Sequence, residues 1–482
     1  MDNSEKIIQL EAQINALKIK ITELCIENTA LCTKNTALRT ENTELKQENA
    51  QLKHSLNQNS QNSSKPPSSD GLKKLTRNQS LRKKGRKKSG GQEGHKGHTL
   101  KQVSKPDHII SHDLSCCPGC KCDLNQTDVD DFVIRQVFDI PLPKVEVTEH
   151  RAEIKQCPSC KKRVCADFPD GVRAPVSYGQ NIKSFAVYLQ HQQLIPEDRL
   201  QSLFADLFKL PLATATLNSF TDQAFNELEI FEQTVLKLVS KAPVKHLDET
   251  GFRINGKTQW LHVSSDKTLT YYHISPKRKA LLPDLSGTVV HDHYKPYYQL
   301  NDVNHGLCNA HHLRELNALI EDEESWAKKM SHWLLCSLRY KKLHRGKSIA
   351  ADKLVRLRAS YTEIVKEGLA YHESLKPLIK KSRCGKAPKR KGHNLLLRLW
   401  NYCDDVLRFL TDPEVPFTNN QAEQDIRMMK CKQKISGGFR TTKGAEKFIR
   451  IRGFISNARK QSWNILESIQ KVFNKKVPLP DG

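Results

Sequence analysis

The chain has 482 residues and a formal net charge of +25, with 78 Lys and Arg against 53 Asp and Glu. Hydrophobic residues make up 37% of the chain, below the roughly 45–50% of a typical globular protein. This length predicts about three domains, and the low apolar share predicts that part of the chain lies outside any packed core. No apolar run approaches the roughly 18 residues of a membrane helix, so we expect no membrane span. The polar N-terminus predicts no secretory signal.

Residues 1–56 form the first predicted element, a leucine-zipper coiled coil. Leu recurs at every seventh position from Leu10 to Leu52, beside a seam of Ile in the first three heptads and Asn in the later four. Leu at d with Ile or Asn at a predicts a parallel, in-register dimer. A single amphipathic helix packed on its own chain is the alternative. A basic-zipper regulator is disfavoured, because in that class the basic helix runs directly into the zipper from its N-terminal side.

Residues 57–105 form a predicted flexible basic linker. Within it, residues 73–88 carry nine Lys or Arg and no acid. The charge of this tract, and of the whole chain, predicts binding to DNA, because basic side chains release counterions from phosphates. A solvated tail is the alternative for the tract, and a merely basic soluble protein is the alternative for the chain.

Residues 106–172 are predicted to form a zinc ribbon. The signal is a pair of matched motifs with strand-like sequence at 132–138 and 145–150 between them, Cys117-Pro-Gly-Cys120 and Cys157-Pro-Ser-Cys160. Four thiolates suit tetrahedral Zn²⁺ and leave no open position for water, so we expect a structural ion. Seven of the 14 cysteines lie between Cys116 and Cys165, which favours metal binding in a reducing compartment over a disulfide framework.

Two regions of different periodicity follow the cysteine motifs. Residues 173–240 are predicted to be helical, either as a helix-turn-helix DNA-binding region or as a plain helical bundle. From residue 241 the pattern changes to strands, and we expect them at 246–254, 258–263, 269–274, 287–291 and 306–310. Three antiparallel strands followed by further strands and helices match an RNase H-like core.

Three acidic residues lie at positions where an RNase H-like core carries catalytic carboxylates. Asp248 and Asp292 each follow a short apolar run, and Glu423 opens a predicted helix. Carboxylates in this arrangement can hold two Mg²⁺ or Mn²⁺ ions, which clamp the attacking and leaving oxygens of a phosphodiester. The alternatives are structural: either Asp can cap a turn, and Glu423 can form a capping box with Asn420 or pair with Arg427.

The spacing of the acids predicts an insertion. Glu423 lies 131 residues beyond Asp292, so residues 241–312 are the first part of the core, 313–412 a helical insertion, and 413–482 the second part with C-terminal helices. Cys308 and His311 have the spacing of zinc ligands, but no second pair lies nearby, so we expect them to brace the site or simply to pack. Basic residues predicted to contact DNA are Arg314, Arg427, Lys430, Lys432, Lys434 and Arg440. Residues 376–391, with eight Lys or Arg and no acid, are a further candidate DNA-contacting loop or a solvated connection.

Several motifs in combination resemble transposases of the insertion sequence 66 family: Lys65-Pro-Pro-Ser-Ser-Asp70, Asp248-Glu-Thr-Gly251, Cys308-x-x-His311-x-x-Arg314 and Asn419-Asn-Gln-Ala-Glu423. The resemblance implies a DDE transposase with Asp248, Asp292 and Glu423 as catalytic metal ligands, and it matches Tyr294 to the family's tyrosine after the second Asp. The histidines on both sides of Asp292 depart from the family pattern.

The resemblance implies a function in full. Such a protein binds the terminal inverted repeats of a bacterial insertion sequence, releases 3′ hydroxyls by cleavage, and joins them to target DNA by two-metal phosphoryl transfer. We expect a homodimer or higher homo-oligomer held by the zipper, in the bacterial cytoplasm at the nucleoid. One alternative is a catalytically silent DNA-binding protein derived from a transposase, and another is a structure-specific nuclease without strand transfer.

Overall fold

The structure is a computed structural model, and its described residues fall into two units. The first unit comprises Met1–Asn78 and Thr288–Asn419, and the second comprises Gln79–Gly287 and Asn420–Gly482. The basic tract 73–88 and residues 379–386 of the second basic tract lie outside the described residues. Those described are 3–56, 100–140, 143–169, 171–172, 174–282, 284–344, 346–378 and 387–480.

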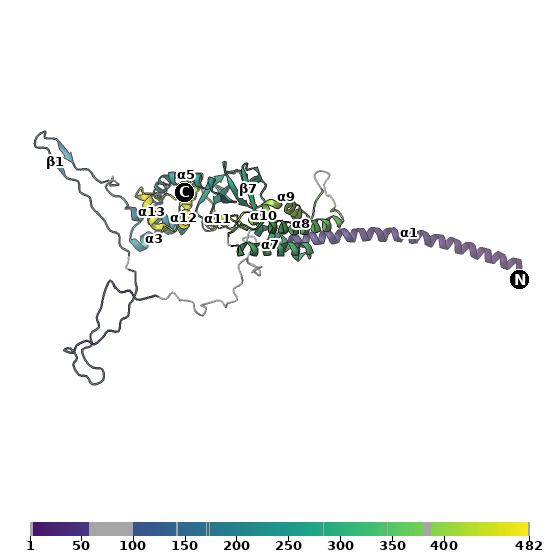
Figure 1. Cartoon of the computed structure of the whole chain (residues 1–482), viewed down its shortest axis with the longest axis horizontal. Helices are drawn as coiled ribbons and strands as arrows, with labels where there is room; N and C mark the ends of the chain where they lie inside the picture. Colours follow the sequence, from purple (N-terminus) through teal and green to yellow (C-terminus); the bar gives the residue numbers. More distant parts are fainter. Residues whose placement is uncertain are drawn as a thin grey trace. The chain divides into compact units, whose positions relative to one another are not determined.

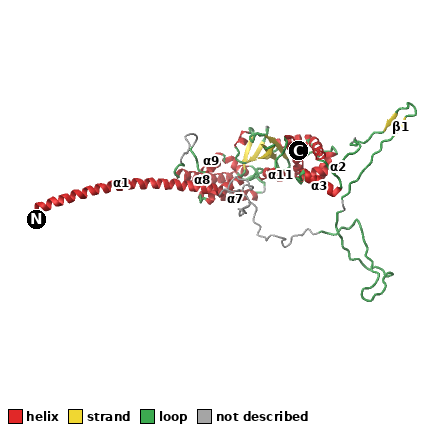
Figure 2. Cartoon of the chain, turned by 180° about the vertical axis from the view of Figure 1, so that it is seen from behind, coloured by secondary structure: helices red, strands yellow, loops and turns green. Residues whose placement is uncertain are grey.

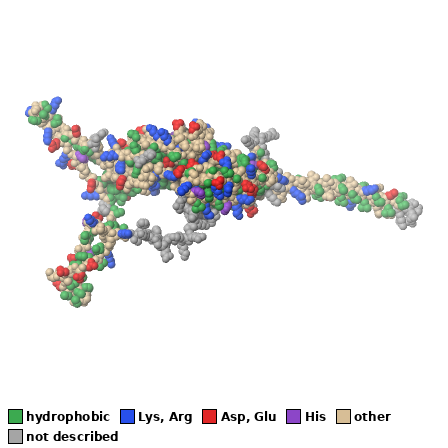
Figure 3. Space-filling view, in the orientation of Figure 1, with side chains coloured by type: hydrophobic (Ala, Val, Ile, Leu, Met, Phe, Trp, Pro, Cys, Tyr) green, Lys and Arg blue, Asp and Glu red, His purple; other side chains and the backbone are tan. Residues whose placement is uncertain are grey.

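The N-terminal segment is one long helix, α1 (Asn3–Leu56). Its d-position leucines, from Leu10 to Leu52, are each 55–61% exposed, and hydrophobic side chains recur along the helix in Figure 3. The described part of the chain therefore leaves the apolar seam of α1 uncovered. No helix among the described residues is long and apolar enough to cross a membrane.

A helical bundle makes up most of the first unit after β6 (Gly287–His291), η3 (Lys295–Gln299) and β7 (Val303–Leu307). In it, α7 packs on α6 and α8, and α9 packs on α8 and α10, as Figure 1 shows for the green helices. Gly368 lets α8 and α9 approach closely, because a Cβ there would lie 2.6 Å from Leu396 Cδ2. The bounds are α6 (Asn309–Glu321), α7 (Ser325–Leu343), α8 (Ala351–Ser374), α9 (Lys391–Asn401) and α10 (Cys403–Thr411).

The larger sheet has the strand order β5-β4-β3-β6-β7. In the second unit, β3 (Val244–Ile254), β4 (Lys257–Ser265) and β5 (Thr270–Ser275) form an antiparallel meander, drawn in yellow in Figure 2. Asn255 and Gly256 join β3 to β4 with φ angles of 46° and 72°, as a tight hairpin turn requires. The sequence predicted these three strands within a few residues, whereas β7 begins at Val303, before the predicted 306–310.

Helices of the second unit build two hydrophobic cores. One core packs α2 (Gln180–Val187), α3 (Glu197–Phe208), α4 (Thr214–Glu227) and α5 (Glu229–Lys241) with α12 (Thr442–Lys460) and α13 (Ile465–Phe473). The other packs α11 (Asn420–Ser436) and α12 on the meander. Helix α4, the second helix of the candidate helix-turn-helix, has no Lys or Arg and packs against α2, α12 and α13. That composition is closer to a bundle helix than to a DNA-reading helix.

The cysteine-rich segment differs from the prediction in its strands. Residues 132–138 and 145–150 form no strand in the structure, and their apolar side chains are exposed, with Val133 at 91% and Val147 at 90%. Instead β1 (Ile154–Gln156) and β2 (Arg163–Cys165) pair on either side of the second cysteine motif, and the rest is extended chain (Figure 2). Alternating apolar residues form a strand only when a partner strand and a covering core are present, and nothing described in this segment supplies either.

Candidate active site

Asp248 lies on the side of β3 that faces α11. In the antiparallel register it stands opposite Val263, which is part of the core formed with α11. Side chains alternate along a strand, so Asp248 shares its face with Phe252 and Ile254, which belong to the same core. The backbone N–H of Glu249 donates to Asp248 Oδ1 at 2.9 Å, which orients this half-buried carboxylate.

Glu423 lies in the first turn of α11. It precedes Ile426, a member of the core shared with β3, by three residues, which is close to one helical turn. A carboxylate in the first turn is favoured by the helix dipole. The second unit therefore carries two of the three predicted acids on elements that pack directly on each other, although 174 residues separate them in the sequence.

A buried polar network fixes α11 two residues beyond Glu423. Lys460 Nζ donates to Asp425 Oδ2 at 2.9 Å and to the carbonyls of Asp266 and Leu269 at 2.8 Å each. The side chains of Lys460 and Asp425 are only 10% and 9% exposed, and the Tyr272 hydroxyl donates to the Asp425 carbonyl at 2.7 Å. Burial lowers the pKa of Lys460 while Asp425 opposes that shift. These contacts tie α11 to α12 and to the β4–β5 turn, and sequence reasoning missed them.

Asp292 directly follows β6 in the first unit. The backbone N–H of Tyr294 donates to Asp292 Oδ1 at 2.9 Å, a side-chain turn that leads into η3. On one side, His291 is fully buried, and its Nδ1 bonds the Asp292 carbonyl while its Nε2 lies 3.0 Å from His305 Nδ1. A carbonyl only accepts, so His291 carries its proton on Nδ1 and accepts from His305.

The two histidines beside Asp292 belong to a buried cluster of rings. The His293 ring lies 5.2 Å from Tyr402 and 5.3 Å from His312, between centroids. Burial lowers the pKa of both His291 and His293 to about 3. These imidazoles are therefore neutral packing groups near neutral pH, and their departure from the family pattern reflects the ring cluster that they fill.

A close backbone contact between Gly287 and Pro243 lies just before β3. Gly287 has a φ of +78°, and a Cβ there would lie 2.6 Å from the Pro243 carbonyl oxygen. Lys245 is fully buried, and its Nζ donates to the carbonyls of Ala242, at 2.8 Å, and Ser286. Burial lowers the pKa of Lys245 to about 8. Only glycine fits this contact, and no sequence pattern predicts it beyond the glycine itself.

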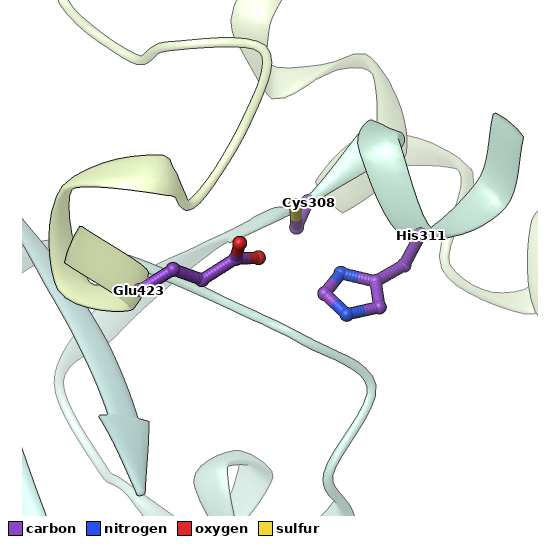
Figure 4. Close-up of side chains that lie close together, drawn as sticks. All are labelled: Cys308, His311 and Glu423. Carbon is purple, nitrogen blue, oxygen red and sulfur yellow. The ribbon is translucent and has the colours of Figure 1, made fainter. Parts of the chain in front are cut away.

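Cys308 and His311 lie at the start of α6. Cys308 is buried, and its Sγ accepts from the backbone N–H of Asn419 at 3.2 Å. Figure 4 shows Cys308, His311 and Glu423, whose ligand atoms all lie within 4.8 Å of one another. Thiolate, imidazole and carboxylate are all metal-binding groups, but the same arrangement also occurs in packed, metal-free sites.

Each cysteine motif forms the same turn. Lys121 and Lys161 have φ angles of 62° and 59°, and their backbone N–H groups donate to the carbonyls of Cys117 and Cys157 at 2.9 Å each. Hydrogen bonds from the Cys120 backbone lower the pKa of Cys117, and those from Cys160 lower that of Cys157. These turns suit thiolate ligands. Among the described residues, however, no group of three or more cysteines from the two motifs comes within 4.8 Å.

The predicted DNA-binding residues lie on three elements. Arg314 is on α6, and Arg440 is exposed in the loop after α11. Lys430 donates to the Gly251 carbonyl at 3.2 Å, and burial lowers its pKa while Asp248 opposes the shift. The Lys432 ammonium lies 6.0 Å from the Phe448 ring centroid. Exposed cations on α11 itself are Arg427, Lys430 and Lys434.

Two family models match parts of the chain. Residues 4–101 match a family of unknown function (DUF6444). No curated protein matches the chain. Residues 175–447, which hold all three acids and more than half of the chain, match the Transposase IS66 family. The chain therefore belongs to the Transposase IS66 family.

Proposed function

We propose that this transposase binds the terminal inverted repeats of a bacterial insertion sequence, cleaves to release 3′ hydroxyls, and joins them to target DNA. Asp248, Asp292 and Glu423 are the proposed catalytic metal ligands. One observation carries the proposal: Asp248 lies on the face of β3 against which α11 packs, and Glu423 is in the first turn of α11.

Asp292 is proposed as the second acid because it directly follows β6 and lies within the part of the chain that matches the family. The Tyr294 hydrogen bond then holds the Asp292 carboxylate in a defined orientation.

The donor set suits Mg²⁺ or Mn²⁺, because all three proposed ligands are carboxylates and these ions prefer oxygen. When bound, two such ions activate the attacking oxygen and stabilise the leaving one. The protein's own part is to hold its ligands still, through the Asp425–Lys460 network for Glu423 and the turn at Tyr294 for Asp292. Lys430, whose pKa is affected by Asp248, offsets part of the carboxylate charge before metal binding.

The remaining assignments concern DNA and assembly. Arg314, Arg427, Lys430, Lys432, Lys434 and Arg440 are the proposed phosphate contacts, since cations beside the acids would draw the DNA backbone in. The four cysteines Cys117, Cys120, Cys157 and Cys160 are proposed to hold a structural Zn²⁺. The uncovered seam of α1 is proposed to pair with a second copy in parallel, because Asn faces Asn in that register.

The test is a Mg²⁺-dependent assay on DNA that carries the element's terminal repeats. Asp248→Asn should abolish cleavage and strand transfer while DNA binding persists, because it removes charge from a metal ligand but not a phosphate contact. The matched control is Asp206→Asn, at an exposed position on α3, which should cleave normally. Retained cleavage in Asp248→Asn would falsify the site, binding without any cleavage by the unmodified protein would indicate the silent alternative, and cleavage without joining would indicate a nuclease.

A further inference from the structure

Two acid-free segments far apart in the sequence carry exposed cations. Residues 250–265 hold Arg253 and Lys257 and no Asp or Glu, and residues 426–445 hold six Lys or Arg and no Asp or Glu. The first segment runs from the middle of β3 through the turn and along β4, and the second runs from α11 into α12. No pattern in the sequence predicts that these two segments lie side by side.

The structure joins them through the backbone. The Phe439 N–H donates to the Arg253 carbonyl at 2.8 Å, and the Asn255 N–H donates to the Phe439 carbonyl at 2.8 Å. Ile254 and Phe439 thereby form a parallel bridge. The Phe439 ring packs edge-on against Phe252 at 5.8 Å between centroids, so the loop is anchored by its side chain as well.

The Gly437-Gly438 pair makes this contact possible. Gly437 has a φ of +69°, which favours glycine, and a Cβ on Gly438 would lie 2.6 Å from the Arg253 carbonyl oxygen. The close approach that these glycines permit is thus to the hairpin backbone. It fixes the loop at residues 437–440 as a strap across the end of β3.

Four exposed cations are gathered by this strap: Arg253, Lys257, Arg440 and Lys443. We name them the hairpin–strap surface. Within the described residues none of the four makes a salt bridge, and their charged groups make one weak hydrogen bond, from Arg253 to the Gly256 carbonyl at 3.3 Å.

We propose that the hairpin–strap surface binds the phosphate backbone of duplex DNA. Exposed cations without acids among them and without salt-bridge partners in the described residues are available to phosphates, and duplex DNA presents one negative charge per roughly 1.7 Å. The proposal rests on the proposed function for its DNA substrate, and it adds the β3–β4 hairpin, with Arg253 and Lys257, to the contacts. Contacts to phosphate position the protein but carry no sequence information, so we expect this contact to be independent of sequence.

The experiment measures the salt dependence of affinity with full-length protein. Kd is determined across a range of salt for duplex DNA with the element end and for an unrelated duplex, using Arg253→Ala, Lys257→Ala and Lys443→Ala. Each variant should weaken both complexes alike and reduce the slope of log K against log salt by about 0.9. The matched control is Lys237→Ala, which removes an exposed lysine from α5 and should leave the slope unchanged.

A second variant tests the strap without removing a charge. Gly438→Ala should displace residues 437–440 from Arg253, so affinity should fall although all cations remain; its melting curve shows whether the fold persists. Slopes equal to that of Lys237→Ala in all three cation variants overturn the inference, whatever Gly438→Ala does. The inference is also overturned if the cation variants lose affinity for poly-glutamate but keep full affinity for both duplexes. Failure of the unmodified protein to bind any duplex would instead overturn the proposed function.

Discussion

At the scale of single residues, the surroundings of Asp292 explain an unusual sequence. Asp292 has a histidine on each side. His291 forms a hydrogen-bonded pair with His305, and the His293 ring packs against Tyr402 and His312. Both are held neutral by burial, so neither competes with Asp292 as a charged group. The histidines serve packing and orientation around the acid.

The buried Asp425–Lys460 pair supports a prediction at the same scale. Asp425→Asn leaves the Lys460 ammonium buried without its counter-charge, and breaking such a pair costs about 3–5 kcal/mol. Urea unfolding measures the loss. The control is Asp222→Asn, whose partner is Lys447 and whose side chain is 41% exposed; exposed pairs contribute about 0–1 kcal/mol.

Equal losses in these two variants would show that burial of the Asp425–Lys460 pair has no consequence. If Asp425→Asn remains folded, cleavage should require more Mg²⁺ for half-maximal rate, because α11 and Glu423 are less firmly held. Conservative Tyr272→Phe removes only one hydrogen bond to the Asp425 carbonyl and should have a smaller effect on the same measurement.

At the scale of elements, the chain enters β6 through a glycine. Gly287 has a positive φ and meets the Pro243 carbonyl at a distance that excludes any Cβ. Asp292 follows five residues later, directly after β6. The conformation at Gly287 therefore bears on the strand that leads to a proposed catalytic residue.

Gly287→Ala is expected to destabilise the fold and to impair cleavage. The positive φ alone costs about 1–2 kcal/mol for a residue with a Cβ, and the clash with Pro243 adds to it. Gly256→Ala measures the cost of the positive φ alone, because Gly256 has a φ of +72° and nothing lies within 4 Å of the added Cβ. Comparable urea midpoints for the two variants would mean that the close approach of Gly287 to Pro243 adds nothing to the cost of the positive φ.

At the scale of the whole molecule, α1 and the cysteine motifs both present surfaces that the described chain does not cover. The α1 leucines remain more than half exposed, and the two cysteine turns are formed but not brought together. An apolar seam of this length gains its stability by pairing, since each buried leucine contributes about 1.5–3 kcal/mol. Zn²⁺ would likewise convert two separate turns into one folded unit.

Leu31→Glu tests the assembly through α1. A charge at a central d position should split the homo-oligomer, which light scattering measures as a lower mass at equal concentration. Thr33→Glu adds the same charge on the outer face of the heptad, where coiled-coil residues face solvent, and should leave the mass unchanged. If the unmodified protein has the mass of a single chain, α1 does not hold an oligomer together.

The sequence by itself determined the features that depend on local periodicity. Heptads set α1, alternation and turn residues set β3, β4 and β6, and the spacing of Asp292 and Glu423 required the helices α6–α10 between them. Glu423 had the weakest local signal, since a capping box accounts for it equally well, and its assignment depended on the family motif. The strands expected at 132–138 and 145–150 did not form, because alternation does not supply a partner.

Only the tertiary structure decided which distant residues meet. It showed that Asp248 faces α11, that Lys460 holds Asp425, and that Gly438 packs on Arg253. Each of these contacts joins segments that are at least 35 residues apart, and no local pattern encodes such a distance. Hydrophobic periodicity specifies which face of an element is buried, whereas the identity of the neighbour depends on the packing of the whole unit.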